Sequence, residues 1–182
     1  MLKNKNIVLG ITGGIAAYKS ASLIGMLRKN GANVKVIMTK NATQFITPLT
    51  IESLSHNAVA TDMFDKVNNY DIEHISLAKF ADVFVVAPAT ANIIGKVANG
   101  IADDMLSTTI MATNSPIIFA PAMNTNMYNN KIVQANIQKL KDYGYHFVET
   151  QIGMLACGDE GAGKLASLDV ILEKIIKVIK EN

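Results

Sequence analysis

The sequence predicts a doubly wound α/β domain, in which helices cover both faces of a parallel sheet. Two patterns in the 182 residues support this fold class. Short apolar runs alternate with longer segments of helical periodicity, and this alternation is typical of a three-layer parallel sheet. The apolar runs are continuous, which indicates strands that are buried on both faces.

The first strand and helix are expected close to the N-terminus. Residues 7–11, Ile-Val-Leu-Gly-Ile, have the composition of a buried strand. Residues 15–30 have helical periodicity, and the helix is expected to stop at Gly31. Residues 34–38 return to β-branched and apolar side chains and form the second strand.

The third strand is expected at residues 83–87, Val-Phe-Val-Val-Ala. A short helix over residues 71–82 precedes it and carries the only histidine of this region. A second helix opens within residues 88–92, where Thr90 is a candidate N-cap, and runs to Gly100.

The remaining elements continue the same alternation. Residues 117–120 form the fourth strand, residues 132–143 a helix, and residues 145–148 a short strand. The last helix places apolar side chains on one face, at Leu168, Ile171, Leu172, Ile175, Ile176 and Ile179.

Composition narrows the function classes. The formal net charge is +2 and the basic residues are dispersed, so a nucleic-acid partner is not expected. Cys157 is the single cysteine, which excludes an intramolecular disulfide and fits a reducing compartment. The N-terminal segment lacks the pattern of a signal peptide, and no apolar run is long enough for a transmembrane helix. A cytoplasmic protein without a membrane partner is expected.

Small, polar or turn-forming residues follow each of the four main strands. They lie at residues 12–14, 39–41, 88–92 and 121–124. Doubly wound sheets bind ligands at the carboxyl ends of their strands, near the point where the strand order reverses. These four loops are therefore expected to converge on one ligand-binding edge.

Some of these residues have both a functional and a purely structural interpretation. Gly13 and Gly14 precede a helix N-terminus, which suits a phosphate, but they could equally form a plain tight turn. Thr39 and Thr90 could contact a ligand or simply cap the helices that follow them.

Three further side chains are candidates for chemistry. A lone histidine such as His74 is more often an ordinary residue, and no histidine spacing in the chain indicates a metal site. Asn124 could cap the next helix or donate hydrogen bonds to a substrate carboxylate. Cys157 is either a small buried residue or, because glycines surround it, a thiol on a mobile loop that closes over a substrate.

Taken together, these residues resemble the flavin-containing cysteine decarboxylase family. The resemblance runs from the first strand to the last loop and so covers nearly the whole chain. The combination of Pro-x-Met-Asn-x-x-Met with His74 and the Cys157 loop is its most specific part. The matching stretches are residues 10–19, 73–75, 87–92, 100–104, 121–127 and 156–159, the last reading Ala-Cys-Gly-Asp.

The resemblance implies a flavodoxin-like (Rossmann-type) fold that binds FMN at the strand ends. His74 is implied to be the essential base or electrostatic partner, Asn124 the ligand of the substrate carboxylate, and Cys157 a late proton donor. The implied substrate contacts also include Met154, Leu155 and Ala156. The implied FMN contacts are Gly13, Gly14, Ile15, Thr39, Thr90, Ala91, Asn92 and Ala122.

The reaction implied by the resemblance is decarboxylation of 4′-phosphopantothenoylcysteine to 4′-phosphopantetheine in coenzyme A biosynthesis, by a carboxy-lyase. Direct loss of this carboxylate would leave an unstabilised carbanion. Oxidation of the thiol to a thioaldehyde supplies an electron sink, so that CO2 leaves an enethiolate. Return of the two electrons then makes the overall reaction redox-neutral.

Two alternatives share this fold, namely a peptidyl-cysteine decarboxylase of lantibiotic maturation and a non-catalytic regulatory relative. Some members of the latter group lose catalytic residues that are present here. The resemblance also implies a homotrimer or homododecamer with FMN at a subunit interface. Residues 1–182 are expected to form a single flavoprotein decarboxylase domain with no ligase domain.

Overall fold

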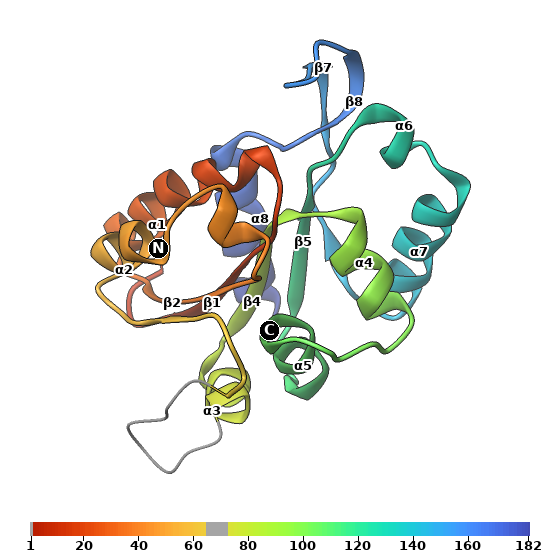
Figure 1. Ribbon diagram of the computed structural model, residues 1–182. Helices are drawn as coiled ribbons and strands as arrows, with labels where there is room; N and C mark the ends of the chain where they lie inside the picture. Colours follow the sequence, from red (N-terminus) through yellow and green to blue (C-terminus); the bar gives the residue numbers. More distant parts are fainter. Residues whose placement is uncertain (1, 65–72) are drawn as a thin grey trace.

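The protein is built around a parallel six-stranded sheet with the order β3-β2-β1-β4-β5-β6 (Figure 1). The computed structural model describes residues 2–64 and 73–182. The strands are β1 (Asn6–Ile11), β2 (Asn33–Met38), β3 (Val59–Ala60), β4 (Val83–Ala89), β5 (Ile117–Pro121) and β6 (His146–Phe147). All neighbouring strands of this sheet are parallel, which confirms the predicted fold class.

The strand order reverses between β1 and β4. The chain runs outward from β1 to β2 and β3, then returns to place β4 on the other side of β1. Without the two-residue edge strand β3 the order is that of flavodoxins, and with it the order is that of dinucleotide-binding folds. The β1/β4 boundary is therefore the place where a ligand is expected.

Helices cover both faces of the sheet. One face packs against α1 (Lys19–Lys29) and α8 (Leu168–Glu181), and α2 (Pro48–Ser55) lies beside α1. The other face packs against α3 (Glu73–Phe80), α4 (Ala91–Ala98), α5 (Met105–Ala112) and α7 (Lys131–Asp142). Ile7 and Leu9 of β1 belong to the first core cluster and Val8 to the second, because successive strand side chains point to opposite faces.

Several boundaries differ from the prediction. The first helix begins as a 3-10 turn, η1 (Ile15–Tyr18), before α1 starts. Strand β4 continues through Pro88 to Ala89, because its pairing with β5 is interrupted after Val86 and resumes at Ala89. The short helix expected over residues 71–82 begins at Glu73 in the structure, and Asp71 and Ile72 lie outside the described residues.

Other elements were not predicted. Two of them, α2 and α5, lie in segments between the predicted elements for which no helix or strand was expected. A further short 3-10 turn is η2 (Ala42–Gln44), and α6 (Thr125–Tyr128) follows β5. The Cys157 segment, expected to be a loop, is the turn of an antiparallel hairpin formed by β7 (Gln151–Met154) and β8 (Glu160–Lys164).

Within residues 2–64 and 73–182, every helix is too short or too polar to span a membrane.

Candidate active site

The hydroxyl of Thr12 joins the carboxyl ends of β1 and β4. It donates to the carbonyl of Pro88 at 2.7 Å and accepts from the backbone N–H of Thr90 at 3.1 Å. Thr12 is buried, so these bonds are shielded from water. The contact fixes the start of α4 next to the glycine turn, at the reversal point of the sheet.

Gly13 brings the loop after β2 to the same edge. A Cβ atom on Gly13 would lie 2.4 Å from Asn41 Cβ and 2.8 Å from the Asn41 carbonyl carbon. Only glycine allows this approach. Thr39 at the end of β2 is held there too, because its N–H donates to the Ile11 carbonyl at 3.0 Å.

The helix starts at this edge differ in whether a side chain caps them. Thr39 Oγ1 accepts from the Ala42 N–H at 3.2 Å. This is the structural interpretation of Thr39, in which its side chain bonds the backbone at the start of the following helical turn. Gly14 and Thr90 precede η1 and α4, and neither supplies a side-chain cap. The N–H groups that open η1 and α4 therefore remain available for a ligand.

This edge fits the phosphate of FMN. Gly14 lies beside Thr90, with its virtual Cβ 3.7 Å from Thr90 Cγ2, so the two uncapped turns face each other. Ile15, Ala91 and Asn92 belong to these two helix starts. Uncapped backbone N–H groups at helix starts are the donor type that binds phosphate.

Asn124 both caps a helix and presents its amide donor to the hairpin. Its Oδ1 accepts from the Asn126 N–H at 2.8 Å, which caps α6 and fixes the orientation of the amide. The Nδ2 group therefore points toward the β7–β8 hairpin, where it lies 3.2 Å from Asp159 Oδ2 and 3.5 Å from Cys157 Sγ. Two candidates that are 33 positions apart in the sequence are thus brought into contact.

The hairpin is fastened to the segment that carries Asn124. The Met123 N–H donates to the Gly163 carbonyl at 2.9 Å, and Thr125 Oγ1 donates to the Ala162 carbonyl at 2.9 Å. A Cβ on Gly163 would lie 2.4 Å from the Met123 oxygen, so glycine is required for this contact. Figure 1 shows the hairpin standing above α6.

Cys157 is exposed at the turn of the hairpin, and its thiol donates to Asp159 Oδ2 at 3.3 Å. Met154, Leu155 and Ala156 precede it, and Met154 is exposed. Asp159 was not among the predicted site residues. The signal for it was present, because Asp159 closes the Ala-Cys-Gly-Asp stretch.

Ala122 also lies at this edge. Its N–H donates to the Ala89 carbonyl at 3.0 Å, which joins the ends of β5 and β4.

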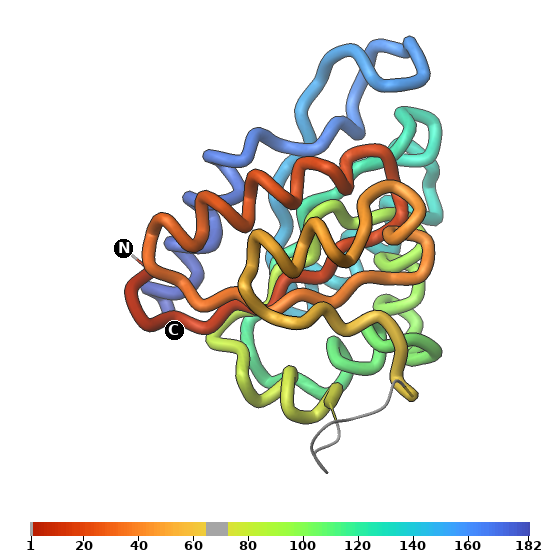
Figure 2. Tube along the Cα trace, turned by 60° about the vertical axis from the view of Figure 1, so that its left-hand side comes forward, coloured from red at the N-terminus to blue at the C-terminus, as the bar shows by residue number. Residues whose placement is uncertain are grey.

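His74 is not brought to this cluster within one chain. It is half-buried near the start of α3. In both Figure 1 and Figure 2, α3 lies at the bottom of the molecule and the β7–β8 hairpin at the top. The chain therefore unites Asn124 and Cys157 but leaves His74 apart from them.

An ion-pair network supports the far end of α4. Lys96 Nζ lies 2.6 Å from Asp103 and 2.8 Å from Asp104. Burial would lower the pKa of Lys96, but its hydrogen bonds to both carboxylates outweigh this and raise the pKa. Burial would raise the pKa of Asp104, but hydrogen bonds from Lys96 and Ser107 outweigh this and lower the pKa. The network fixes residues 103–104 against the helix whose first turn lies at the candidate site.

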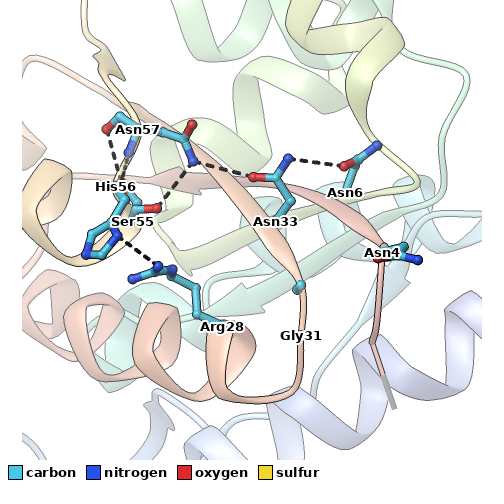
Figure 3. Close-up of a pocket in the computed structure, with 9 residues that line it drawn as sticks. Asn4, Asn6, Arg28, Gly31, Asn33, Ser55, His56 and Asn57 are labelled. Carbon is cyan, nitrogen blue, oxygen red and sulfur yellow. Dashed lines mark hydrogen bonds between the residues drawn. The ribbon is translucent and has the colours of Figure 1, made fainter.

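A surface depression of about 530 Å³ lies elsewhere, at the amino edge of the sheet (Figure 3). Its polar side chains are largely paired with one another or with the backbone. Arg28 bonds His56 and the Leu54 carbonyl, and the Asn57 amide contacts Asn33. Size alone does not make this the functional site, since ligands of doubly wound sheets bind at the opposite edge.

The sequence and the fold of this chain are similar to those of known proteins. The model of the flavoprotein family matches residues 1–180. A coenzyme A biosynthesis bifunctional protein, CoaBC, of Borreliella burgdorferi is 51% identical over 179 residues, which are 98% of this chain and 45% of that protein. This chain thus spans about half the length of that relative.

A probable phosphopantothenoylcysteine decarboxylase of Streptococcus mutans is 47% identical over 173 residues, covering 94% of this chain and 97% of that one. Among solved structures, the FMN-dependent cysteine decarboxylase SpaF superposes with a TM-score of 0.85 at 30% identity. The match covers 98% of this chain and 99% of that one.

Proposed function

This chain belongs to the flavoprotein family, and on that premise we propose that it is an FMN-dependent carboxy-lyase. Its substrate is 4′-phosphopantothenoylcysteine and its product 4′-phosphopantetheine, an intermediate of coenzyme A biosynthesis. The observation that carries the proposal is the meeting of the Asn124 amide, which follows β5, and the Cys157 thiol at the turn of the β7–β8 hairpin. The names of the B. burgdorferi, S. mutans and SpaF proteins support the same reaction class. Residues 1–182 act as one catalytic domain.

The cofactor is held at the carboxyl edge. Gly13, Gly14 and Ile15 line its phosphate side together with Thr90, Ala91 and Asn92, because these residues open the two uncapped helix starts. Thr39 and Ala122 close the flanks of the same edge. When bound, FMN supplies reversible acceptance of two electrons, which a thiol-to-thioaldehyde oxidation requires.

Asn124 and Cys157 act on the substrate. The Asn124 Nδ2 group donates to the substrate carboxylate, since its orientation is fixed by the cap on α6. Loss of CO2 from the thioaldehyde leaves an enethiolate, and Cys157 supplies the proton needed at carbon in the final reduction. Met154, Leu155 and Ala156 line the substrate from the same hairpin.

His74 takes the proton of the substrate thiol, and it comes from a second copy of the chain. This assignment follows from the separation of α3 from the hairpin within one chain. Exposed apolar side chains around the edge suit a subunit contact, and they are Ile15, Tyr18, Phe45 and Leu49. The assembly is a homotrimer or a homododecamer, and a cytoplasmic location suits the single exposed thiol.

The proposal is tested by incubating the FMN-loaded protein with 4′-phosphopantothenoylcysteine and following CO2 and product by mass. Release of CO2 with formation of 4′-phosphopantetheine is expected, and Asn124→Ala should abolish it. Asn129→Ala is the control, since its exposed side chain lies at the other end of α6. Consumption of a cysteine-ending peptide alone would favour the peptidyl-cysteine decarboxylase. A flavin-loaded protein that consumes neither compound would overturn the catalytic assignment.

A further inference from the structure

We propose that Asp159 is a positioning residue that occupies, in the free protein, the Asn124 donor reserved for the substrate carboxylate. The inference rests on the proposed function and extends it to the state before substrate binds. Asp159 Oδ2 accepts from Asn124 Nδ2 at 3.2 Å. The protein's own carboxylate thus makes the hydrogen bond that the substrate's carboxylate makes later.

The amide of Asn124 has no second way to hold Asp159. Its Oδ1 is committed to the Asn126 N–H at 2.8 Å, so only Nδ2 faces the hairpin. An amide NH2 group recognises a carboxylate by donating to it, whichever molecule carries the carboxylate. The Nδ2 group carries two N–H donors, and in the free protein its partners are Asp159 Oδ2 and Cys157 Sγ. The substrate carboxylate therefore has to displace one of these contacts, and Asp159 is the carboxylate with which it competes.

The same oxygen of Asp159 also accepts from the thiol. Cys157 Sγ lies 3.3 Å from Asp159 Oδ2 and 3.5 Å from Asn124 Nδ2, so the three groups form a closed triangle. Displacement of Asp159 from Asn124 breaks one side of this triangle and leaves the bond between Cys157 and Asp159 in place. Arrival of the substrate carboxylate at Asn124 thereby frees the Asp159–Cys157 pair from Asn124.

The hairpin turn keeps Asp159 and Cys157 together. The Leu155 N–H donates to the Asp159 carbonyl at 2.8 Å, and the Gly158 N–H donates to the Leu155 carbonyl at 3.0 Å. Gly158 has a φ of +90°, which favours glycine and closes the turn tightly. The side chains of Asp159 and Cys157 are exposed. Replacement of Asp159 by the substrate carboxylate at Asn124 therefore does not require moving a buried charge into water.

The test uses two unreactive analogues and the FMN-loaded protein. The first is the substrate with alanine in place of its cysteine residue, which keeps the carboxylate but has no thiol to oxidise. The second is the same compound without the carboxylate. Dissociation constants are measured from the change in flavin absorbance for the wild type, Asp159→Ala and Glu160→Ala. Glu160 is the matched control, an exposed neighbouring carboxylate at the start of β8.

Asp159→Ala should bind the carboxylate analogue about three- to tenfold more tightly, the range expected from removing one competing hydrogen bond. Its affinity for the second analogue should not change, and Glu160→Ala should alter neither constant. In an Asn124→Ala background, Asp159→Ala should lose its effect, because the contested donor is gone.

Other results would overturn the inference. One such result is that Asp159→Ala binds both analogues more tightly by the same factor, and another is that it binds the carboxylate analogue more weakly than the wild type does. Either result would show that Asp159 affects the hairpin in general and does not compete with the substrate carboxylate for Asn124. If the wild type binds both analogues and Asp159→Ala changes nothing, this inference fails while the proposed function stands. If the FMN-loaded wild type binds neither analogue, the proposed function and the inference fail together.

Discussion

Thr12 and Pro88 are joined by a buried hydrogen bond of 2.7 Å, from the threonine hydroxyl to the proline carbonyl. The two residues are 76 positions apart, and the bond lies at the β1/β4 reversal point. Pro88 lies where the pairing of β4 with β5 is interrupted, and the Thr12 hydroxyl provides a hydrogen-bond donor for its carbonyl. Thr12 lies in one of the loops expected at the ligand-binding edge, but its bonds to Pro88 and Thr90 were not predicted.

Thr12→Val should weaken both stability and FMN binding. The substitution keeps the shape but leaves the Pro88 carbonyl and the Thr90 N–H unpaired, at a cost of about 1–3 kcal/mol. Denaturant unfolding and FMN titration of the apoprotein measure the two effects. Thr12→Ser keeps the hydroxyl and should retain most of both. A Thr12→Val protein with unchanged FMN affinity would show that this bond does not position the site.

Gly13→Ala should destabilise the protein by about 1–3 kcal/mol, because the added methyl group overlaps the backbone and side chain of Asn41. FMN binding should fall with it. Gly25→Ala is the matched control, since a Cβ at this position of α1 would have no atom within 4 Å apart from its chain neighbours and the adjacent backbone of its own helix. That control should stabilise the protein by about 0.5–1 kcal/mol. Equal effects of the two substitutions in urea unfolding would contradict the close-approach argument.

His74→Asn and Cys157→Ser should each prevent formation of the normal product, at different steps of the reaction. The first should prevent reduction of the flavin by substrate, and the second should release CO2 but stall at an oxidised product. If neighbouring copies share each site, subunits of the two variants mixed in one assembly should recover part of the activity. His56→Asn is the histidine control, because His56 lies at the amino edge. Mixed assemblies with no recovery would place His74 and Cys157 in the same copy.

Lys96→Gln should remove a pH-dependent part of the stability. The pKa of Asp104 is lowered from its ordinary 3.8, so its contribution is complete above that pH and is lost as the pH falls through the folded-state value. The pKa of Lys96 is raised from 10.5, so its contribution is lost only as the pH rises above that value.

At pH 7 the variant should therefore be less stable than the wild type by about 1 kcal/mol, a size typical of a partly exposed ion pair. The difference should shrink below pH 3.8. Urea unfolding from pH 7 to pH 3 measures it, and Lys79→Gln, at an exposed lysine of α3, is the control. A constant difference across this range would exclude the ion pair as its cause.

Much of the scaffold could be predicted from local patterns. The strands near residues 7–11, 83–87 and 117–120 are continuous apolar runs, the run at residues 34–38 is interrupted by Lys35, and the structure confirms all four strands. A strand that is buried on both faces needs apolar side chains at nearly every position. Such a strand can therefore be recognised from a few consecutive residues. The predicted strand at residues 145–148 shrinks to His146–Phe147, because it pairs only with Ile118 and Phe119 of β5.

The β7–β8 hairpin could not be predicted in this way. Both strands are short, β7 is mostly exposed, and the largely half-buried β8 holds two glycines, so neither a period-2 pattern nor an apolar run marks the hairpin. Its place is set by contacts of Gly163 and Ala162 with residues 123–125, which are far away in the sequence. Asp159 closes the Ala-Cys-Gly-Asp stretch in the sequence, but its bonds to Asn124 and Cys157 are visible only in three dimensions.

The sequence by itself determined the parallel sheet, the edge on which its loops converge, and the candidate residues Asn124 and Cys157. Apolar runs and loop composition are local properties, and strand direction then dictates which loops meet. Only the tertiary structure decided which of these residues touch. It brought Asp159 into contact with both Asn124 and Cys157, joined Thr12 to Thr90, and separated His74 from them. Hydrogen bonds between segments that are distant in the sequence produce no periodic pattern of residue types. These contacts could therefore be identified only from the three-dimensional structure.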